Sequence, residues 1–368
     1  MRRSATVLKV LVVLVAIDWW VRGPFFRSYV MPCFVLNYIM PRDRTNGTQP
    51  SILIDAIAYL PRASARIAFI GDSTIKALDG PDTASVPFLV REFLRERLAR
   101  RDIDVVDLSV IGLHVDDAAL LADKLLAANV DVIVYDVLLR AFRTTPERDF
   151  LTAVRSDLGP GDLARLTKVG GLPWLMRTTR LEDLIRGFVR SSLATYAYRL
   201  ELSSWVLEME PSLDAVLHQP AMAAWTSQPP PMGSREFEMT AAEFGYPSAS
   251  WDAFELLARL CREHAPWRCL VMTGPLNPEF RDAIEPGLYE DFRRRARVIA
   301  EDNKIVWRDY TDSMTGDLFW PSNFVSQARY VHLTDRGRMN LASELVEPPA
   351  TMVETGRRGG STAAISSY

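Results

Sequence analysis

From residue 65 to residue 346, short runs of β-branched and aliphatic residues alternate with helical patterns. Strands are predicted at residues 67–70, 103–108, 130–135, 269–272 and 305–307. Helices are predicted near residues 86–100, 116–128, 250–263, 287–302 and 335–346, where apolar residues recur at helical spacing. Alternating strands and helices indicate a parallel sheet covered on both faces. We therefore expect a three-layer, flavodoxin-like α/β fold.

An insertion is predicted between the third and fourth strands. Residues 137–248 are too many for a simple crossover, so we expect a helical cap. Residues 140–199 carry eleven Arg or Lys against six Asp or Glu, whereas residues 200–248 carry one Arg against seven acidic residues. A helical stripe in the basic half is expected to pack on the core, and the alternative is a lipid-facing or acyl-binding surface. The stripe consists of Leu181, Leu184, Ile185, Phe188, Val189 and Tyr196.

The first 22 residues have the pattern of a membrane anchor. Arg2 and Arg3 precede a segment, residues 5–21, that is apolar except for Lys9 and Asp18. We expect one uncleaved transmembrane helix over residues 1–22, with a cleaved signal peptide or a buried helix as alternatives. The paired arginines favour a cytoplasmic N-terminus, which places the rest of the chain outside the cytoplasm, in the periplasm or extracellular space.

The remaining segments and the composition limit the other possibilities. Residues 23–64 are interpreted as a juxtamembrane linker, residues 65–346 as the main domain, and residues 347–368 as a disordered tail. The net charge of −3 argues against nucleic-acid binding. The three cysteines and four histidines show no zinc-ligand spacing, so no metal or cofactor is expected. Cys261 and Cys269 can pair in an oxidising compartment or remain as two buried thiols.

Two residues carry the candidate chemistry. Ser73 follows the first predicted strand at the turn that opens a helix, and this edge of a parallel sheet is where ligands bind. His332 directly precedes the last predicted helix. An imidazole can activate a serine hydroxyl if the fold brings the two together. His114 is expected to take a helix N-terminal position with a local hydrogen bond rather than to line the site.

Three short blocks around these residues resemble the SGNH (GDSL) hydrolase family. They are Gly71-Asp72-Ser73, then Leu108-Ser109-Val110-Ile111-Gly112, and His332-Leu333-Thr334 with Gly337. The resemblance implies that Ser73 is the nucleophile and His332 its base. It also implies that the backbone N–H groups of Ser73 and Gly112 form an oxyanion hole.

The sequence departs from that family at two places. The third block, Gly-x-Asn-Asp, is absent, and Val134-Tyr135-Asp136-Val137-Leu138 stands there. The last block of the family reads Asp-x-x-His, but Arg329 occupies the place of the aspartate. Asp309, Asp312 and Asp317 are possible substitutes. Loss of the orienting carboxylate or of an oxyanion donor weakens transition-state stabilisation.

The anchor, the insertion and the degenerate third block resemble those of anchored SGNH-type proteins that work beside membrane-bound O-acyltransferases. These include proteins of teichoic acid D-alanylation and exopolysaccharide acetylation. The resemblance implies a membrane-tethered serine esterase or O-acyltransferase that acts on a glycan or anionic cell-envelope polymer. The alternative is a catalytically weak SGNH-like scaffold that binds a polymer or an acyltransferase partner.

Overall fold

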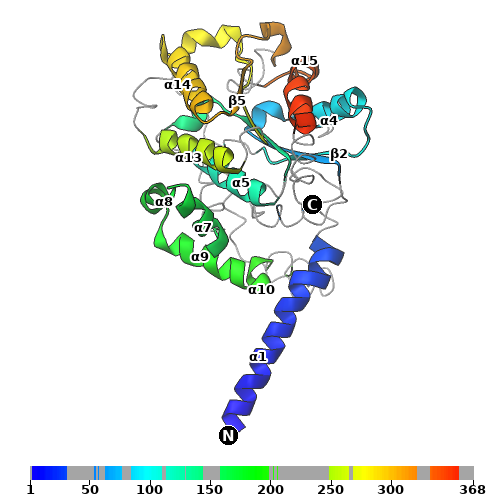
Figure 1. Ribbon diagram of the computed structural model, residues 1–368, viewed down its shortest axis with the longest axis vertical. Helices are drawn as coiled ribbons and strands as arrows, with labels where there is room; N and C mark the ends of the chain where they lie inside the picture. Colours follow the sequence, from blue (N-terminus) through cyan, green and yellow to red (C-terminus); the bar gives the residue numbers. More distant parts are fainter. Residues whose placement is uncertain are drawn as a thin grey trace, which may run out of the picture.

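The computed structural model describes most of the chain outside the second half of the cap. The described residues are 2–30, 54, 57, 63–76, 84–109, 113–128, 130–143, 158–198, 202, 205, 248–264, 268–320 and 332–355. They form an α/β body from which the first helix extends (Figure 1).

Five parallel strands form the central sheet in the order β2-β1-β3-β4-β5. The strands are β1 (Ala65–Ile70), β2 (Ile103–Asp107), β3 (Val132–Asp136), β4 (Cys269–Thr273) and β5 (Val306–Asp309). In register, Phe69 of β1 lies between Asp107 of β2 and Val134 of β3. This is the flavodoxin-like strand order, so the predicted sheet is confirmed.

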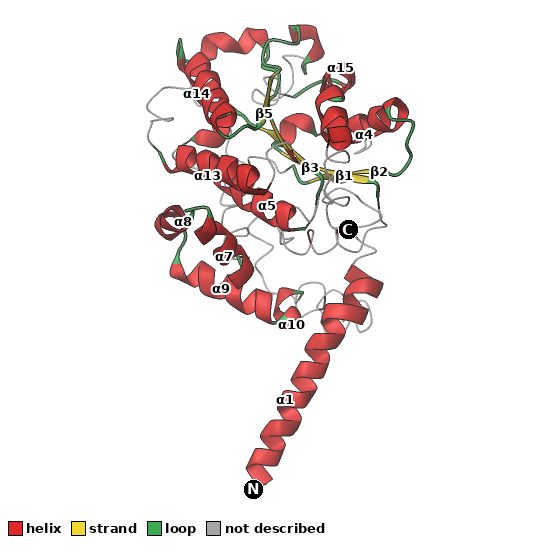
Figure 2. Ribbon diagram, viewed as in Figure 1, coloured by secondary structure: helices red, strands yellow, loops and turns green. Residues whose placement is uncertain are grey.

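Helices cover both faces of the sheet (Figure 2). The helices α4 (Val86–Arg97) and α15 (Asp335–Leu345) lie on one face, and α5 (Val115–Ala127), α13 (Ala249–His264) and α14 (Leu288–Asp302) lie on the other. Alternate residues of β1 point to opposite layers, because Ile67 and Phe69 join one buried cluster while Ala68 and Ile70 join the other. Strands that are buried on both faces read as continuous apolar runs, which is why the sequence predicts them well.

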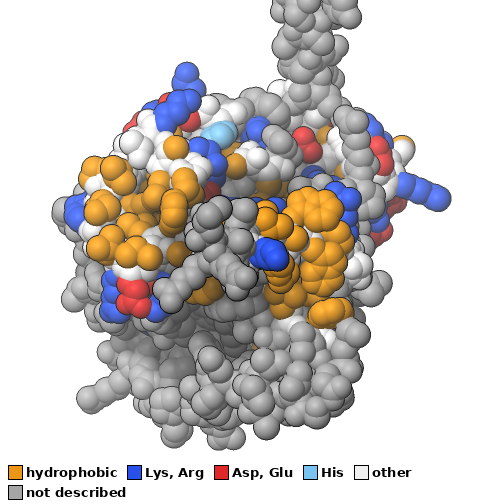
Figure 3. All heavy atoms as spheres, turned by 90° about the horizontal axis from the view of Figure 1, so that it is seen from below, with side chains coloured by type: hydrophobic (Ala, Val, Ile, Leu, Met, Phe, Trp, Pro, Cys, Tyr) orange, Lys and Arg blue, Asp and Glu red, His pale blue; other side chains and the backbone are white. Residues whose placement is uncertain are grey.

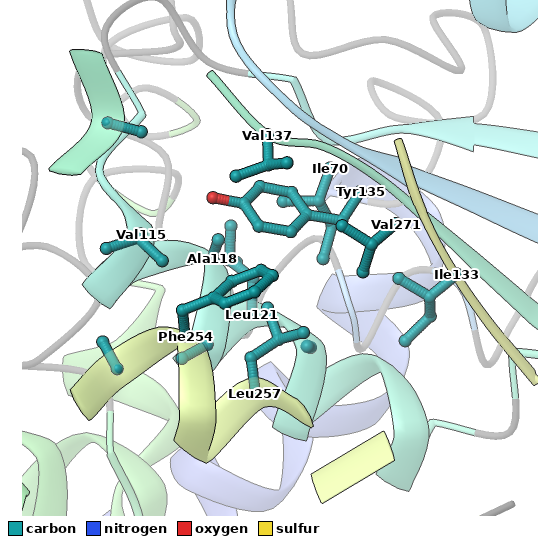
Figure 4. Packing of buried hydrophobic residues seen from close by; sticks show 14 of the residues in the cluster. Ile70, Val115, Ala118, Leu121, Ile133, Tyr135, Val137, Phe254, Leu257 and Val271 are labelled. Atoms are coloured by element: carbon teal, nitrogen blue, oxygen red, sulfur yellow. The ribbon is translucent and has the colours of Figure 1, made fainter. Parts of the chain in front are cut away.

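The larger cluster lies between the sheet and the α5–α13 pair (Figure 4). The ring of Tyr135 in β3 packs 6.5 Å from the ring of Phe254 in α13, and Leu121 of α5 lies beside them. A disulfide joins Cys261 of α13 to Cys269 of β4, so the two thiols left open by the sequence are paired.

The described part of the insertion is helical, as predicted. After η4 (Leu139–Phe142) come α7 (Pro160–Lys168), α8 (Leu172–Thr178), α9 (Leu181–Ser192) and α10 (Ala194–Ala197). Ion pairs attach α7 to α5, with Lys124 Nζ 2.8 Å from Asp162 Oδ2 and Arg165 Nη2 2.9 Å from Asp123 Oδ2.

The apolar stripe of α9 does not pack on the core as a unit, so this prediction is wrong. Leu184 packs partly on the main cluster, but Leu181, Ile185 and Phe188 are exposed. The side of α9 that faces the body instead carries Asp183 and Gly187, which are buried.

The N-terminal segment forms α1 (Arg2–Trp20), which continues into the π-helix η1 (Val21–Val30). We expected a transmembrane helix here. Among the described residues, no helix combines the length and the hydrophobicity that crossing a membrane requires. Because η1 extends to Val30, the beginning of the predicted linker is helical. Its residues Phe25 and Phe26 are buried against Tyr198 and Trp205.

The prediction of a disordered tail from residue 347 is wrong for residues 347–355. These residues are helical, and Ala350, Met352 and Val353 are buried in the cluster beneath α4 and α15. Pro348 suggested the end of the fold, but proline is well tolerated in the first turn of a helix. Residues 356–368 lie outside the described part of the chain.

Candidate active site

The candidate nucleophile lies on the turn after the first strand. β1 ends at Ile70, and the short 3-10 helix η2 (Ser73–Ile75) begins two residues later, with Ser73 as its first residue. Gly71 packs closely at this turn, because a Cβ there would lie 3.0 Å from the Cβ of Asp136 and from Ile75 Cδ1. The close packing of this turn against β3 therefore fixes the backbone at Ser73.

Side-chain hydrogen bonds from two residues connect this turn to the end of β3 and the helix η4 that follows it. The guanidinium of Arg140 in η4 donates from Nε to Asp72 Oδ2 at 2.7 Å, and Nη2 donates to the same oxygen. The hydroxyl of Thr74 donates to Asp136 Oδ2 at 2.6 Å. The residues on both sides of Ser73 are thus held by side chains of the third strand and the turn that follows it.

Asp136 is a buried carboxyl group at the centre of this arrangement. Burial raises its pKa to about 7, and the charge of Asp72 acts in the same direction, while the Thr74 hydrogen bond and the N–H of Gly274 oppose the shift. A Cβ on Gly274 would lie 2.9 Å from Asp136 Oδ1, so glycine makes room for the carboxyl group on the β4 side. Near neutral pH, Asp136 therefore exchanges a proton close to the Ser73 turn.

The candidate base lies in a well-anchored segment before α15. The backbone N–H of Trp320 donates to the His332 carbonyl at 3.0 Å, and the N–H of Thr334 donates to the Leu318 carbonyl at 2.9 Å. The Trp320 and His332 rings lie 5.1 Å apart. Thr334 caps α15 by accepting from the N–H of Gly337. A Cβ on Gly337 would lie 2.4 Å from the Leu318 carbonyl oxygen, so only glycine fits in this first turn.

The direction of α15 places its beginning at the same sheet edge as Ser73. The chain runs from the carboxyl end of β1 through α4 to the amino end of β2, so Arg97 in the last turn of α4 lies at the amino edge. Arg97 forms an ion pair with Glu347, which follows α15. The end of α15 therefore lies at the amino edge, and its beginning, with His332, at the carboxyl edge. The structure thus brings both candidate residues to the edge that carries ligand sites in open α/β sheets.

The three possible replacement carboxylates are engaged with other groups. Asp309 accepts from Thr273 Oγ1 at 2.7 Å and from Arg293 Nε at 2.7 Å. Asp312 accepts from Arg281 and from Arg293. Asp317 accepts from Thr315 and pairs with Arg336. Their described contacts assign none of them as the residue that orients His332.

The other residues singled out by the sequence fall into two groups. Gly112 and Arg329 lie outside the described residues. His114 caps α5 by accepting from the Asp116 N–H, and its Nε2 lies 2.9 Å from the Arg143 carbonyl, so the local hydrogen bond expected there is confirmed.

Sequence reasoning missed Arg140, Asp136 and Thr74. Their side chains meet Asp72 and one another across more than sixty positions of sequence. A signal existed at residues 136–140, where Asp136 and Arg140 flank three apolar residues at the end of a buried strand. Such polar groups at the end of a buried strand indicate a site rather than a core.

A pocket lies farther along the same edge, beside the ends of β4 and β5. Leu276 follows β4 and Thr311 follows β5, and both line this pocket. Tyr289, Arg281 and Arg293 complete its mixed apolar and charged wall. Neither Ser73 nor His332 lines this pocket. A serine and a histidine at one sheet edge can carry out acyl transfer to or from a bound hydroxyl compound if their side chains meet.

No family model and no curated protein matches this chain. Among solved structures, the chain is similar to a putative GDSL-like lipase from Parabacteroides merdae (12% identity, 79% of this chain and 97% of that chain, TM-score 0.39). It is also similar to the lipase/acylhydrolase from Enterococcus faecalis (12% identity, 80% and 96%, TM-score 0.38). A third is an acetyl xylan esterase variant from Geobacillus stearothermophilus (14% identity, 78% and 94%, TM-score 0.34).

Proposed function

We propose that this chain is a serine acyl-ester hydrolase or O-acyltransferase of the SGNH (GDSL) type. The observation that carries the proposal is the placement of Ser73 after β1 and of His332 before α15 at one edge of the parallel sheet. The motifs around the two residues, and the glycines that their close packing requires, support the same assignment.

In the proposed reaction, the Ser73 oxygen attacks the acyl carbonyl while the imidazole of His332 takes the hydroxyl proton. N–H groups of Ser73 and Gly112 stabilise the tetrahedral oxyanion. Its collapse breaks the ester bond, and His332 returns the proton to the leaving alcohol. The acyl-enzyme then passes its acyl group to water or to a sugar hydroxyl, which His332 deprotonates in turn.

Arg140 takes part by positioning the nucleophile turn. It lies just after β3, in the region where the SGNH family carries its third-block asparagine, and it bonds the residue before Ser73. A guanidinium cannot lose its proton at neutral pH.

We further propose that α1 holds the protein at a membrane with its catalytic domain outside the cytoplasm. The hydrophobic side chains of residues 10–15, in the middle of α1, are all exposed, although water disfavours such a surface. The Cys261–Cys269 disulfide fits an oxidising compartment. In this setting the substrate is an acylated glycan or cell-envelope polymer, and a membrane-bound O-acyltransferase is the proposed partner.

A second candidate is a catalytically weak SGNH-like scaffold for such an acyltransferase. The two departures from the SGNH blocks favour it, because Asp136-Val137-Leu138 stands where the family has its third-block asparagine and Arg329 stands where it has the aspartate of its last block.

The deciding experiment is labelling of the full chain with a fluorophosphonate probe. An enzyme is modified at Ser73, as located by mass spectrometry, and Ser73→Ala abolishes the labelling. If the wild-type chain resists the probe while Ser73→Ala still supports polymer acylation in cells, the scaffold is the correct function. Protease added to intact cells tests the orientation, because the exported domain should be digested.

A further inference from the structure

The cap helix α9 packs on the body through the side that carries Asp183, Leu184 and Gly187. Asp183 and Gly187 face the body, and a Cβ on Gly187 would lie 2.3 Å from the Leu158 carbonyl oxygen. This close approach fixes which side of α9 is covered. The opposite side carries Leu181, Ile185 and Phe188, which are 70%, 56% and 56% exposed. Residues spaced by three and four positions lie together on a helix surface, so the three form one continuous stripe.

The helix α8 and the residue that follows α9 also expose large hydrophobic side chains. Leu172, Met176 and Leu193 are also exposed. We call these three residues together with Leu181, Ile185 and Phe188 the apolar cap face. Soluble proteins rarely expose so many large hydrophobic side chains on two adjacent helices, so this surface is expected to have an occupant.

The apolar cap face lies at the end of the molecule from which α1 extends. In Figure 1, α7 to α10 lie between the sheet and the free end of α1. Asp18 of α1 accepts from the Thr195 N–H at 2.9 Å, and Arg22 donates to the Ser192 carbonyl at 3.2 Å, so the cap and the base of α1 are joined. Seen from this end, hydrophobic side chains gather in two regions of the surface (Figure 3).

The charge around the apolar cap face suits a lipid headgroup region. Residues 160–192 contain six Arg or Lys and three Asp or Glu. Arg177, Arg180 and Arg186 are exposed on α8 and α9 or between them. Within the protein, Arg177 pairs with Asp252 of α13 and Arg186 pairs with Glu182. Exposed apolar stripes on helices with a basic excess are typical of helices that lie in a membrane interface, where the apolar groups enter the acyl boundary and basic groups near them reach phosphates.

We propose that the apolar cap face lies on the lipid bilayer, so that α8 and α9 form a second membrane contact beside α1. The inference rests on the membrane tether of the proposed function and adds to it which face of the domain meets the lipid. With two contacts instead of one, the domain has a fixed orientation relative to the bilayer.

The test uses the full chain with Cys33→Ser, in which the two remaining cysteines are paired, reconstituted in vesicles of phosphatidylcholine and phosphatidylglycerol. Single cysteines are introduced as Phe188→Cys on the cap face and Val298→Cys on α14, and each is labelled with a fluorophore. Val298 is the matched control because it is also a large hydrophobic residue, 48% exposed, but lies on another helix. A third label, Val13→Cys, reports on α1.

Nitroxide-bearing lipids should quench the label at position 188 by about twofold or more, and leave the label at 298 unchanged. Quenching at position 13 without quenching at 188 would overturn the inference and leave the tether intact. A response at 188 that requires an added membrane acyltransferase would also overturn it, because the surface would then bind protein. If neither 13 nor 188 responds, both the tether and this inference are wrong. Fluorophosphonate labelling of the same samples reports independently on the proposed chemistry.

Discussion

The hydroxyl of Thr74 donates a 2.6 Å hydrogen bond to the carboxyl group of Asp136, which ties the residue after the candidate nucleophile to the end of β3. Gly71, after β1, packs against the Cβ of Asp136, and Gly274, after β4, packs against its carboxyl group. Asp136 therefore connects three neighbouring strands at the edge that carries Ser73.

The stability of the protein should depend on the proton of Asp136. Burial raises the pKa of this group to about 7 in the folded chain. The unfolded chain has an ordinary aspartate pKa near 4, so the folded state holds more protons between about pH 4 and pH 7 and loses stability as the pH rises through that window. In Asp136→Asn, whose amide resembles the protonated acid, this part of the pH dependence should disappear. Urea denaturation at several pH values measures it, and an unchanged slope would contradict the assignment.

Removing one partner of the Asp72–Arg140 ion pair should destabilise the protein more than replacing both partners with neutral residues. Asp72 is almost fully buried, so Arg140→Gln leaves its charge without the main compensating group and should lower the free energy of unfolding by about 3 to 5 kcal/mol. The double variant Asp72→Asn with Arg140→Gln should recover much of this loss. Chemical denaturation of the single and double variants gives the coupling energy. A double variant as unstable as the sum of both single variants would show that the two residues act independently.

Gly337→Ala should displace the beginning of α15. The new Cβ would meet the Leu318 carbonyl oxygen, and we expect a loss of about 1 to 3 kcal/mol of stability. Ester hydrolysis should fall as well, because the same turn positions His332. Gly161→Ala is the matched control, since its Cβ would contact only the flexible end of Arg165 at 3.5 Å. If both variants retain full activity and stability, the turn is more adaptable than its packing indicates.

Ser73 and His332 should behave as one catalytic unit. Turnover of a small activated ester should be low, and Ser73→Ala and His332→Ala should each reduce it to background. The double variant should be no slower than either single variant, because residues of one unit are not additive. A double variant whose losses multiply would assign the two residues to separate steps.

The disulfide should contribute to stability only in an oxidising environment. Replacing Cys261 and Cys269 with alanine should lower the free energy of unfolding by about 2 to 3 kcal/mol, which is the loop-closure value for so short a separation. Thermal unfolding of the wild-type and double-alanine chains with and without reductant tests this expectation. Reductant should destabilise the wild-type chain and leave the variant unchanged.

The sheet and its covering helices could be predicted from the sequence because buried parallel strands are apolar throughout and their helices keep one apolar stripe. Asp136 and Arg140 could not be assigned, because their partners Thr74 and Asp72 are 62 and 68 residues away. The stripe of α9 shows a different limit. Periodicity indicates that Leu181, Ile185 and Phe188 share a face, but the direction of that face is decided by the contact between Gly187 and Leu158.

The outward direction of α9 also affects how the protein behaves in solution. Deleting α1 removes one exposed hydrophobic surface, but the side chains of Leu181, Ile185 and Phe188 remain in contact with water. A truncated domain is therefore expected to self-associate or to require detergent, and its elution volume should depend on concentration. Replacing these three side chains with serine should yield a monodisperse protein suitable for crystallisation, since the inner side of α9, with Asp183, Leu184 and Gly187, is left intact.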